Sequence, residues 1–213
     1  MTIETINFIA RWGHVLFGIT WIGMLYYFNF VQGGYFKQAT PEGLADAKQK
    51  LAPSALWWFR WGAMFTFLTG LVLLGGVQHY GQMNNYIIIG SAMGIIMAAN
   101  VWMVIWPAQK IALGMIEGDA PAAGAKALLA SRTNTLLSAP MLFAMLAGPH
   151  YAGHGYGTAV GGTGLIAALV VIGVLEANAI KGRLGPIASV RGVIVSSLVL
   201  TAVFALMINM FCL

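Results

Sequence analysis

Residues 86–106, YIIIGSAMGIIMAANVWMVIW, form an apolar run without a single charged side chain. A helix needs about 20 such residues to cross the hydrocarbon core of a bilayer. A shorter run at 134–150 contains Pro140, which a membrane helix tolerates when neighbouring groups satisfy the freed carbonyl. Comparable long runs lie at 6–31, 56–80, 159–180 and 187–211. The pattern predicts an all-α fold, a polytopic transmembrane helical bundle of about six spans.

The overall composition supports a chain that lies mostly in lipid. Of 213 residues, 59% are hydrophobic and 8% are charged, whereas soluble domains carry about 25% charged residues. We therefore expect one integral membrane domain over residues 1–213, with the lipid bilayer as its main partner and no nucleic-acid partner. Its one cysteine, Cys212, excludes an internal disulfide framework and a Cys-x-x-Cys-His haem attachment site.

Two connecting segments are longer than the others. Residues 32–55 include a mixed polar and apolar stretch, which predicts a surface helix that begins at Thr40. Residues 108–132 are rich in Gly, Ala and Pro around Asp119-Ala120-Pro121, and we expect a loop there.

The basic residues sort by side when six spans are assumed. Arg11 alone lies toward one side of the membrane, and the other ten lie toward the opposite side. By the positive-inside rule the basic side is cytoplasmic, so both termini are predicted to be periplasmic in a multi-pass protein of a bacterial inner membrane. The ten residues are Lys37, Lys48, Lys50, Arg60, Lys110, Lys126, Arg132, Lys181, Arg183 and Arg191.

His14 is the strongest candidate for chemistry, because ionisable groups inside a span usually face a partner or a cavity. Arg11 precedes it by one helical turn, and Trp21 continues the same stripe. A histidine facing the bundle can ligate haem iron, and Arg11 could pair with a propionate or an anionic substrate. The alternative is that His14 hydrogen-bonds a neighbouring helix and Arg11 extends to the membrane interface.

The other histidines share the predicted periplasmic side but not the depth of His14. His79 and His150 lie near the outer ends of their spans, about eight residues or ~12 Å from the level of His14. They form a separate outer cofactor-binding site or satisfy loop hydrogen bonds, and His154 is expected in a loop. The methionines at a suitable depth for a second axial ligand are Met93, Met97, Met141 and Met145. In an apolar chain, methionines more often fill gaps in the core.

Several longer motifs resemble those of a known family. They are RWGH (11–14), GITWIG (18–23), YYFNF (26–30), WWFRWGA (57–63), NVWMVIWPAQK (100–110) and SRTNTLLSAPMLF (131–143). Together they are similar to the N-terminal membrane domain of bacterial membrane-bound urate oxidases, also called urate hydroxylases. That family ends in a cytochrome c domain, whereas this chain has no Cys-x-x-Cys-His. A looser likeness to haem-binding membrane proteins of the protoporphyrinogen oxidase type also favours haem b.

The resemblance implies a membrane redox protein that oxidises urate and passes electrons to a periplasmic cytochrome c, here expected to be a separate protein or part of a larger membrane complex. We predict a haem-b-binding oxidoreductase or electron carrier in which His14 is the metal ligand and Arg11, Trp21, His79 and His150 are cofactor-binding residues. The alternative is a non-catalytic membrane subunit of a larger respiratory or redox complex, and a transporter is a third interpretation. The sequence is also compatible with a homo-oligomer.

Overall fold

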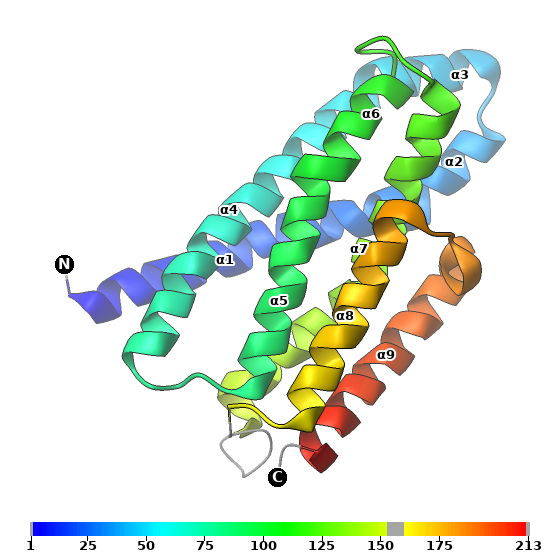
Figure 1. Ribbon diagram of the computed structural model, residues 1–213. Coiled ribbons are helices and arrows are strands. Elements are labelled where there is room, and N and C mark those ends of the chain that lie inside the picture. The colour runs from blue at the N-terminus through cyan, green and yellow to red at the C-terminus, as the bar shows by residue number, and fades with distance from the viewer. Residues whose placement is uncertain (1, 153–159, 212–213) are drawn as a thin grey trace. The chain divides into compact units, whose positions relative to one another are not determined.

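The computed structural model describes residues 2–152 and 160–211, and within those ranges it contains helices and no strand. The predicted all-α fold is therefore confirmed. The elements are α1 (Ile3–Tyr26), α2 (Gly33–Gln38), α3 (Pro41–Asp46), α4 (Ala52–His79), α5 (Asn85–Ala99), α6 (Trp106–Ala112), α7 (Ala120–His150), α8 (Thr163–Lys181) and α9 (Val190–Phe211) (Figure 1). Short π-helical stretches at Tyr27–Gln32, Ala47–Leu51 and Asn100–Ile105 join consecutive helices, and a 3-10 turn, Gly185–Ala188, precedes α9.

Five helical runs in the described part of the chain are long and apolar enough to cross a membrane. Three of them continue through a π-helical stretch, so they exceed the ranges expected from the apolar runs. The chain is thus an all-helical protein with the helices of a membrane protein. The five runs are Ile3–Gln38, Pro41–His79, Asn85–Ala112, Thr163–Lys181 and Val190–Met210.

The predicted sixth span, residues 134–150, lies in α7. This helix has 31 residues and is long enough to span, but it is not among the five that are also apolar enough. Its middle carries a run of buried polar side chains, which lowers its hydropathy. They are Arg132, Thr133, Asn134, Thr135 and Ser138.

The loop expected over residues 108–132 is mostly helical, and that prediction is wrong. The helix α6 extends to Ala112, and α7 already begins at Ala120. Asp119 begins α7, because its Oδ1 accepts a hydrogen bond from the Ala122 backbone N–H at 3.0 Å. Proline in the first helical turn is favourable, since its missing N–H would have no partner there. The Asp-Ala-Pro motif therefore starts a helix, and the alanines that follow favour its continuation.

The helix expected to begin at Thr40 is confirmed. Thr40 Oγ1 accepts a hydrogen bond from the Gly43 backbone N–H at 3.2 Å, and Pro41 occupies the first turn. A threonine at this position satisfies one of the free N–H groups that every helix start exposes. The short α3 then continues into α4 through the π-helical stretch.

The chain divides into two compact units, which are described separately. Unit 1 comprises Met1–Leu73 and Ala98–Ser131, and unit 2 comprises Leu74–Met97 and Arg132–Leu213. The helices α4 and α7 each contribute residues to both units. The units are therefore not separate segments of the chain, and the single membrane domain stays a prediction.

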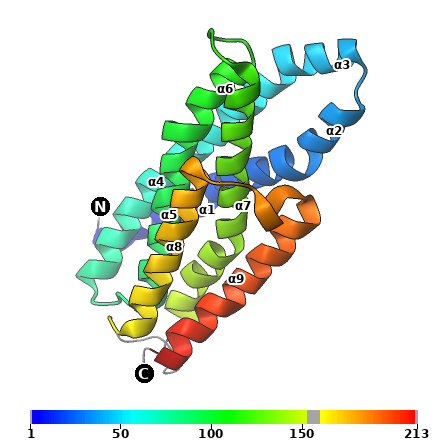
Figure 2. The same cartoon turned by 45° about the vertical axis from the view of Figure 1, so that its right-hand side comes forward.

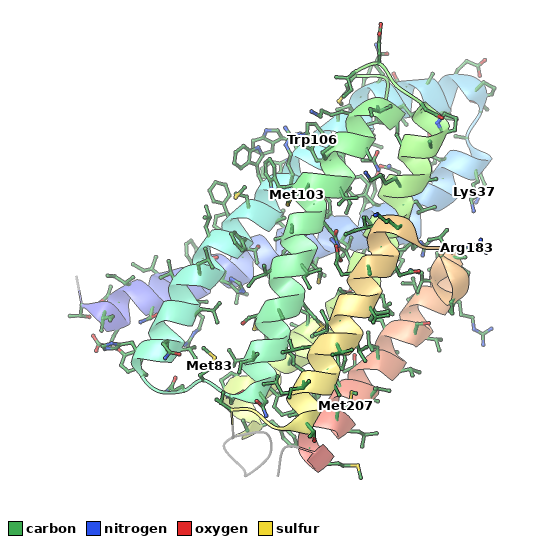
Figure 3. The ribbon with its side chains drawn as sticks, viewed as in Figure 1. Lys37, Met83, Met103, Trp106, Arg183 and Met207 are labelled. Atoms are coloured by element: carbon green, nitrogen blue, oxygen red, sulfur yellow. The ribbon has the colours of Figure 1, made fainter. Side chains whose placement is uncertain are left out.

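In unit 1, α1 packs closely against α4. A side chain at Gly62 of α4 would meet the Trp21 backbone nitrogen at 3.1 Å, so only glycine allows this approach. Phe17 and Phe65 also pack across the same pair of helices, with ring centroids 4.9 Å apart. Near the start of α6, the Arg60 guanidinium lies 3.8 Å from the centroid of the Trp106 ring, a cation–π contact (Figure 3 labels Trp106).

In unit 2, α8 and α9 run side by side in both views (Figures 1 and 2). Tyr86 of α5 is fully buried, and its hydroxyl donates to Asn209 Oδ1 of α9 at 2.6 Å. Gly90 lets α5 approach α7, since a side chain there would lie 3.3 Å from the Met145 backbone nitrogen. These polar and close contacts suit helices that pack without a hydrophobic driving force between them.

Candidate functional site

The side chain of His14 points from α1 toward α4 and is partly buried. Its Nδ1 lies 2.9 Å from the Thr66 carbonyl oxygen and 3.3 Å from Thr69 Oγ1. The Thr69 hydroxyl itself donates to the Phe65 carbonyl at 2.6 Å. His14 therefore hydrogen-bonds a neighbouring helix, which was the alternative to haem ligation in the sequence analysis.

This hydrogen bond determines which ring nitrogen carries the proton. A backbone carbonyl can only accept, so His14 Nδ1 must donate to Thr66. In the neutral ring Nε2 then keeps its lone pair, and it has no hydrogen-bond partner in the described part of the chain. Metal-binding histidines commonly donate their second ring N–H to a carbonyl in this way. The two interpretations of His14 are therefore compatible.

Gly70 of α4 lies directly against the His14 ring. A Cβ atom at position 70 would lie 3.1 Å from His14 Cε1 and 3.4 Å from Nδ1. Contacts that short force the neighbouring group to shift, so glycine leaves the space that the imidazole occupies. Gly18 also lies against α4: a side chain there would be 3.9 Å from the Thr66 methyl group.

Arg11 and Trp21 share α1 with His14 but differ in environment. Arg11 is exposed, and its guanidinium has no hydrogen bond or ion pair to any described residue. Trp21 is only 2% exposed, and its indole N–H is buried without a partner. A free cation and a free buried donor therefore lie on the helix that carries His14.

His79 and His150 belong to unit 2 and are exposed at the last turns of α4 and α7. The His79 ring contacts Tyr80, with centroids 5.0 Å apart. Met93 and Met97 are fully buried in the core of unit 2. His154 lies outside the described residues. His14 belongs to the other unit, unit 1.

No group of three or more His, Cys, Asp or Glu side chains is arranged to hold a metal ion in residues 2–152 and 160–211. His14 is therefore a candidate for a single metal ligand and not part of such a group.

Sequence reasoning missed two features of these sites. The partners of His14 are Thr66, Thr69 and Gly70, and the signal for them was a pair of threonines and a glycine within an apolar span. Arg132 was assigned to a loop among the cytoplasmic basic residues, yet it is 8% exposed inside α7. Its signal was the polar run from 131 to 135 immediately before an apolar segment.

Comparison with known proteins gives one match. Residues 74–208, more than half of the chain, match the family described as "Urate oxidase N-terminal". No curated protein and no solved structure matches the chain. The matched range includes Arg132, His79 and His150, whereas Arg11, His14 and Trp21 precede it. Of the motifs that resemble the family, those at 100–110 and 131–143 lie inside the matched range.

Proposed function

The chain belongs to the urate oxidase N-terminal family, and on that premise we propose that it is a haem-b-binding membrane redox protein of the urate oxidase type. Its substrate is a small molecule, with urate as the first candidate. Electrons pass toward a periplasmic cytochrome c or a larger membrane complex. The protein resides in a bacterial inner membrane, consistent with five helices that are apolar enough to span one.

The observation that carries this proposal is the hydrogen bond from His14 Nδ1 to the Thr66 carbonyl. It holds the ring in the tautomer that leaves Nε2 as a ligand, and it fixes the ring plane against α4. Gly70 leaves the space that the ring occupies. Outer contacts of this kind set the orientation and basicity of a ligating histidine.

Two further residues on α1 fit a haem group. The unpartnered guanidinium of Arg11 supplies a positive charge for a propionate. The free indole N–H of Trp21 is a donor without a protein acceptor. Haem supplies one-electron chemistry when bound. The protein's own contribution is to hold the ligand nitrogen, to balance negative charge at Arg11 and to exclude water with the α1–α4 contact.

The absorption spectrum of the detergent-purified protein tests the proposal. We expect a Soret band that is present in the wild type and lost in His14→Ala. Gln78→Ala, an exposed polar residue near the end of α4, serves as the control and keeps the band. His79→Ala and His150→Ala then show whether either histidine supplies a second axial ligand.

A preparation that stays colourless after incubation with haem would contradict the proposal and favour a non-catalytic membrane subunit. If the band is present, urate-dependent reduction of added cytochrome c distinguishes an enzyme from a carrier. An unchanged Soret band in His14→Ala would remove His14 from the site.

A further inference from the structure

Arg132 is a buried cation without a partner. It lies thirteen positions into α7 and its side chain is 8% exposed. Its Nε and Nη1 atoms are both buried and have no hydrogen-bond partner among the residues that the structure describes. Guanidinium groups stay protonated in proteins, so this is a permanent positive charge.

Neighbouring polar side chains in α7 are satisfied, which makes Arg132 distinct. Asn134 Nδ2 donates to the Met97 carbonyl at 2.9 Å. The Ser138 hydroxyl donates to the Thr135 carbonyl at 2.7 Å, and Thr133 also has an interaction within the chain. The neutral polar groups beside Arg132 thus have partners, whereas its guanidinium has none among the described residues.

Among its described residues, the chain shows no ion pair to Arg132. It has six carboxylate residues, and five of them are exposed: Glu4, Glu42, Asp46, Glu117 and Asp119. The sixth, Glu176, is partly buried and has an interaction of its own, but Arg132 takes no part in one. The ion pair found in the described part of the chain joins Lys50 and Asp46.

A buried charge without a partner costs several kcal/mol, and proteins normally pair such groups or place them where a ligand supplies the opposite charge. An ionisable residue within a membrane helix is accordingly a site hypothesis by default. A planar guanidinium matches delocalised anions whose oxygens can accept two hydrogen bonds. Since no described residue pairs with Arg132, a bound ligand would supply the opposite charge.

We infer that Arg132 binds a small, planar, delocalised organic anion through its buried guanidinium, and that this anion is the substrate. The inference rests on the proposed function, which makes urate, an anion at neutral pH, the first compound to test. The same chemistry is present in the propionates of a haem, so the experiment separates the two sources.

Thermal unfolding of the purified protein, with and without urate, tests the inference. The variants are Arg132→Met and, as a matched control, Lys126→Met, which removes an exposed positive charge from the same helix. We expect urate at about 100 times its Kd to raise the Tm of the wild type and of Lys126→Met by roughly 5 °C or more. Hypoxanthine, a purine that is neutral at pH 7, gives no shift.

Arg132→Met is expected to lose the urate-dependent shift. Without ligand it should unfold at the wild-type temperature or above, because an unpaired buried charge has been removed. A lower Tm without ligand would show that Arg132 has a structural role and would overturn the inference. A retained urate shift in Arg132→Met would overturn it equally.

Haem content, measured as Soret absorbance per protein, separates the sources of the anion. We expect it to be unchanged in Arg132→Met. Loss of haem with the urate response intact would assign the guanidinium to a haem carboxylate and overturn the substrate claim. Absence of a urate shift in the wild type would overturn it too. A wild type that lacks haem but shows the Arg132-dependent shift would refute the proposed function and leave this inference standing.

Discussion

His14 and Arg132 are polar residues in apolar surroundings, and the fold treats them differently. His14 has one ring nitrogen satisfied by the Thr66 carbonyl and the other left open. Arg132 has two guanidinium nitrogens buried and unsatisfied. The histidine is thus held in place by the protein itself, whereas the arginine lacks the partner that its charge requires.

Gly70 gives a residue-scale prediction. Gly70→Ala places a methyl group 3.1 Å from His14 Cε1, so the ring must turn away and strain its hydrogen bond to Thr66. We expect the variant to bind haem several-fold more weakly, measured by titrating the purified apoprotein with haem and following the Soret band. Gly75→Ala is the control on the same helix, since a side chain there meets nothing within 4 Å. Equal affinities for the two variants would count against a positioning role for Gly70.

At this scale the sequence predicted the site only in part. His14 stands out because a histidine inside an apolar run needs a reason. Its partners could not be assigned, because Thr66 is 52 positions away and helix pairing was unknown. Arg132 was misplaced because Pro121 and the surrounding small residues suggested a loop. Whether a charged side chain is buried depends on how the helices pack. The local sign of its burial was the polar run from 131 to 135 before an apolar segment.

Among the elements, α7 is capped by Asp119, the residue that immediately precedes it. Asp119 accepts from the Ala122 N–H at 3.0 Å and lies where the positive end of the helix dipole favours a carboxylate. We expect Asp119→Ala to lower the free energy of unfolding by about 1 kcal/mol. Asp119→Asn should retain most of the stability, because asparagine caps equally well. Denaturant unfolding in detergent would measure the stability of both variants. An unchanged free energy of unfolding in Asp119→Ala would refute the capping role.

The element predictions succeeded where a local signal was present. Five apolar runs gave helices because length and composition suffice for a membrane span. Thr40 was found because its side chain and Pro41 mark a helix start locally. The π-helical stretches that lengthen three of the helices were not predicted from the sequence; two of them contain a buried asparagine, Asn29 and Asn100.

For the whole molecule, the distribution of basic residues predicts the orientation of the chain in the membrane. After Cys212→Ser removes the native thiol, single cysteines at Lys48 and Arg183 should resist a membrane-impermeant maleimide in intact bacterial spheroplasts. A cysteine at Gln82, between α4 and α5, should react. The reason is the positive-inside rule, which assigns the lysine- and arginine-rich connections to the cytoplasm. Reaction at Lys48 and Arg183 with protection at Gln82 would reverse the predicted orientation.

The first helical run has a consequence for what meets the water phase. Ile3–Gln38 has 36 residues, which at ~1.5 Å each amounts to about 50 Å. Even a tilt of about 40° leaves a vertical extent of nearly 40 Å, more than the ~30 Å hydrocarbon layer. Pro41–His79 is longer still. A bilayer crossed by either run would therefore leave part of that helix outside the lipid tails, and a soluble protein would meet a projecting helical segment rather than a flat membrane surface.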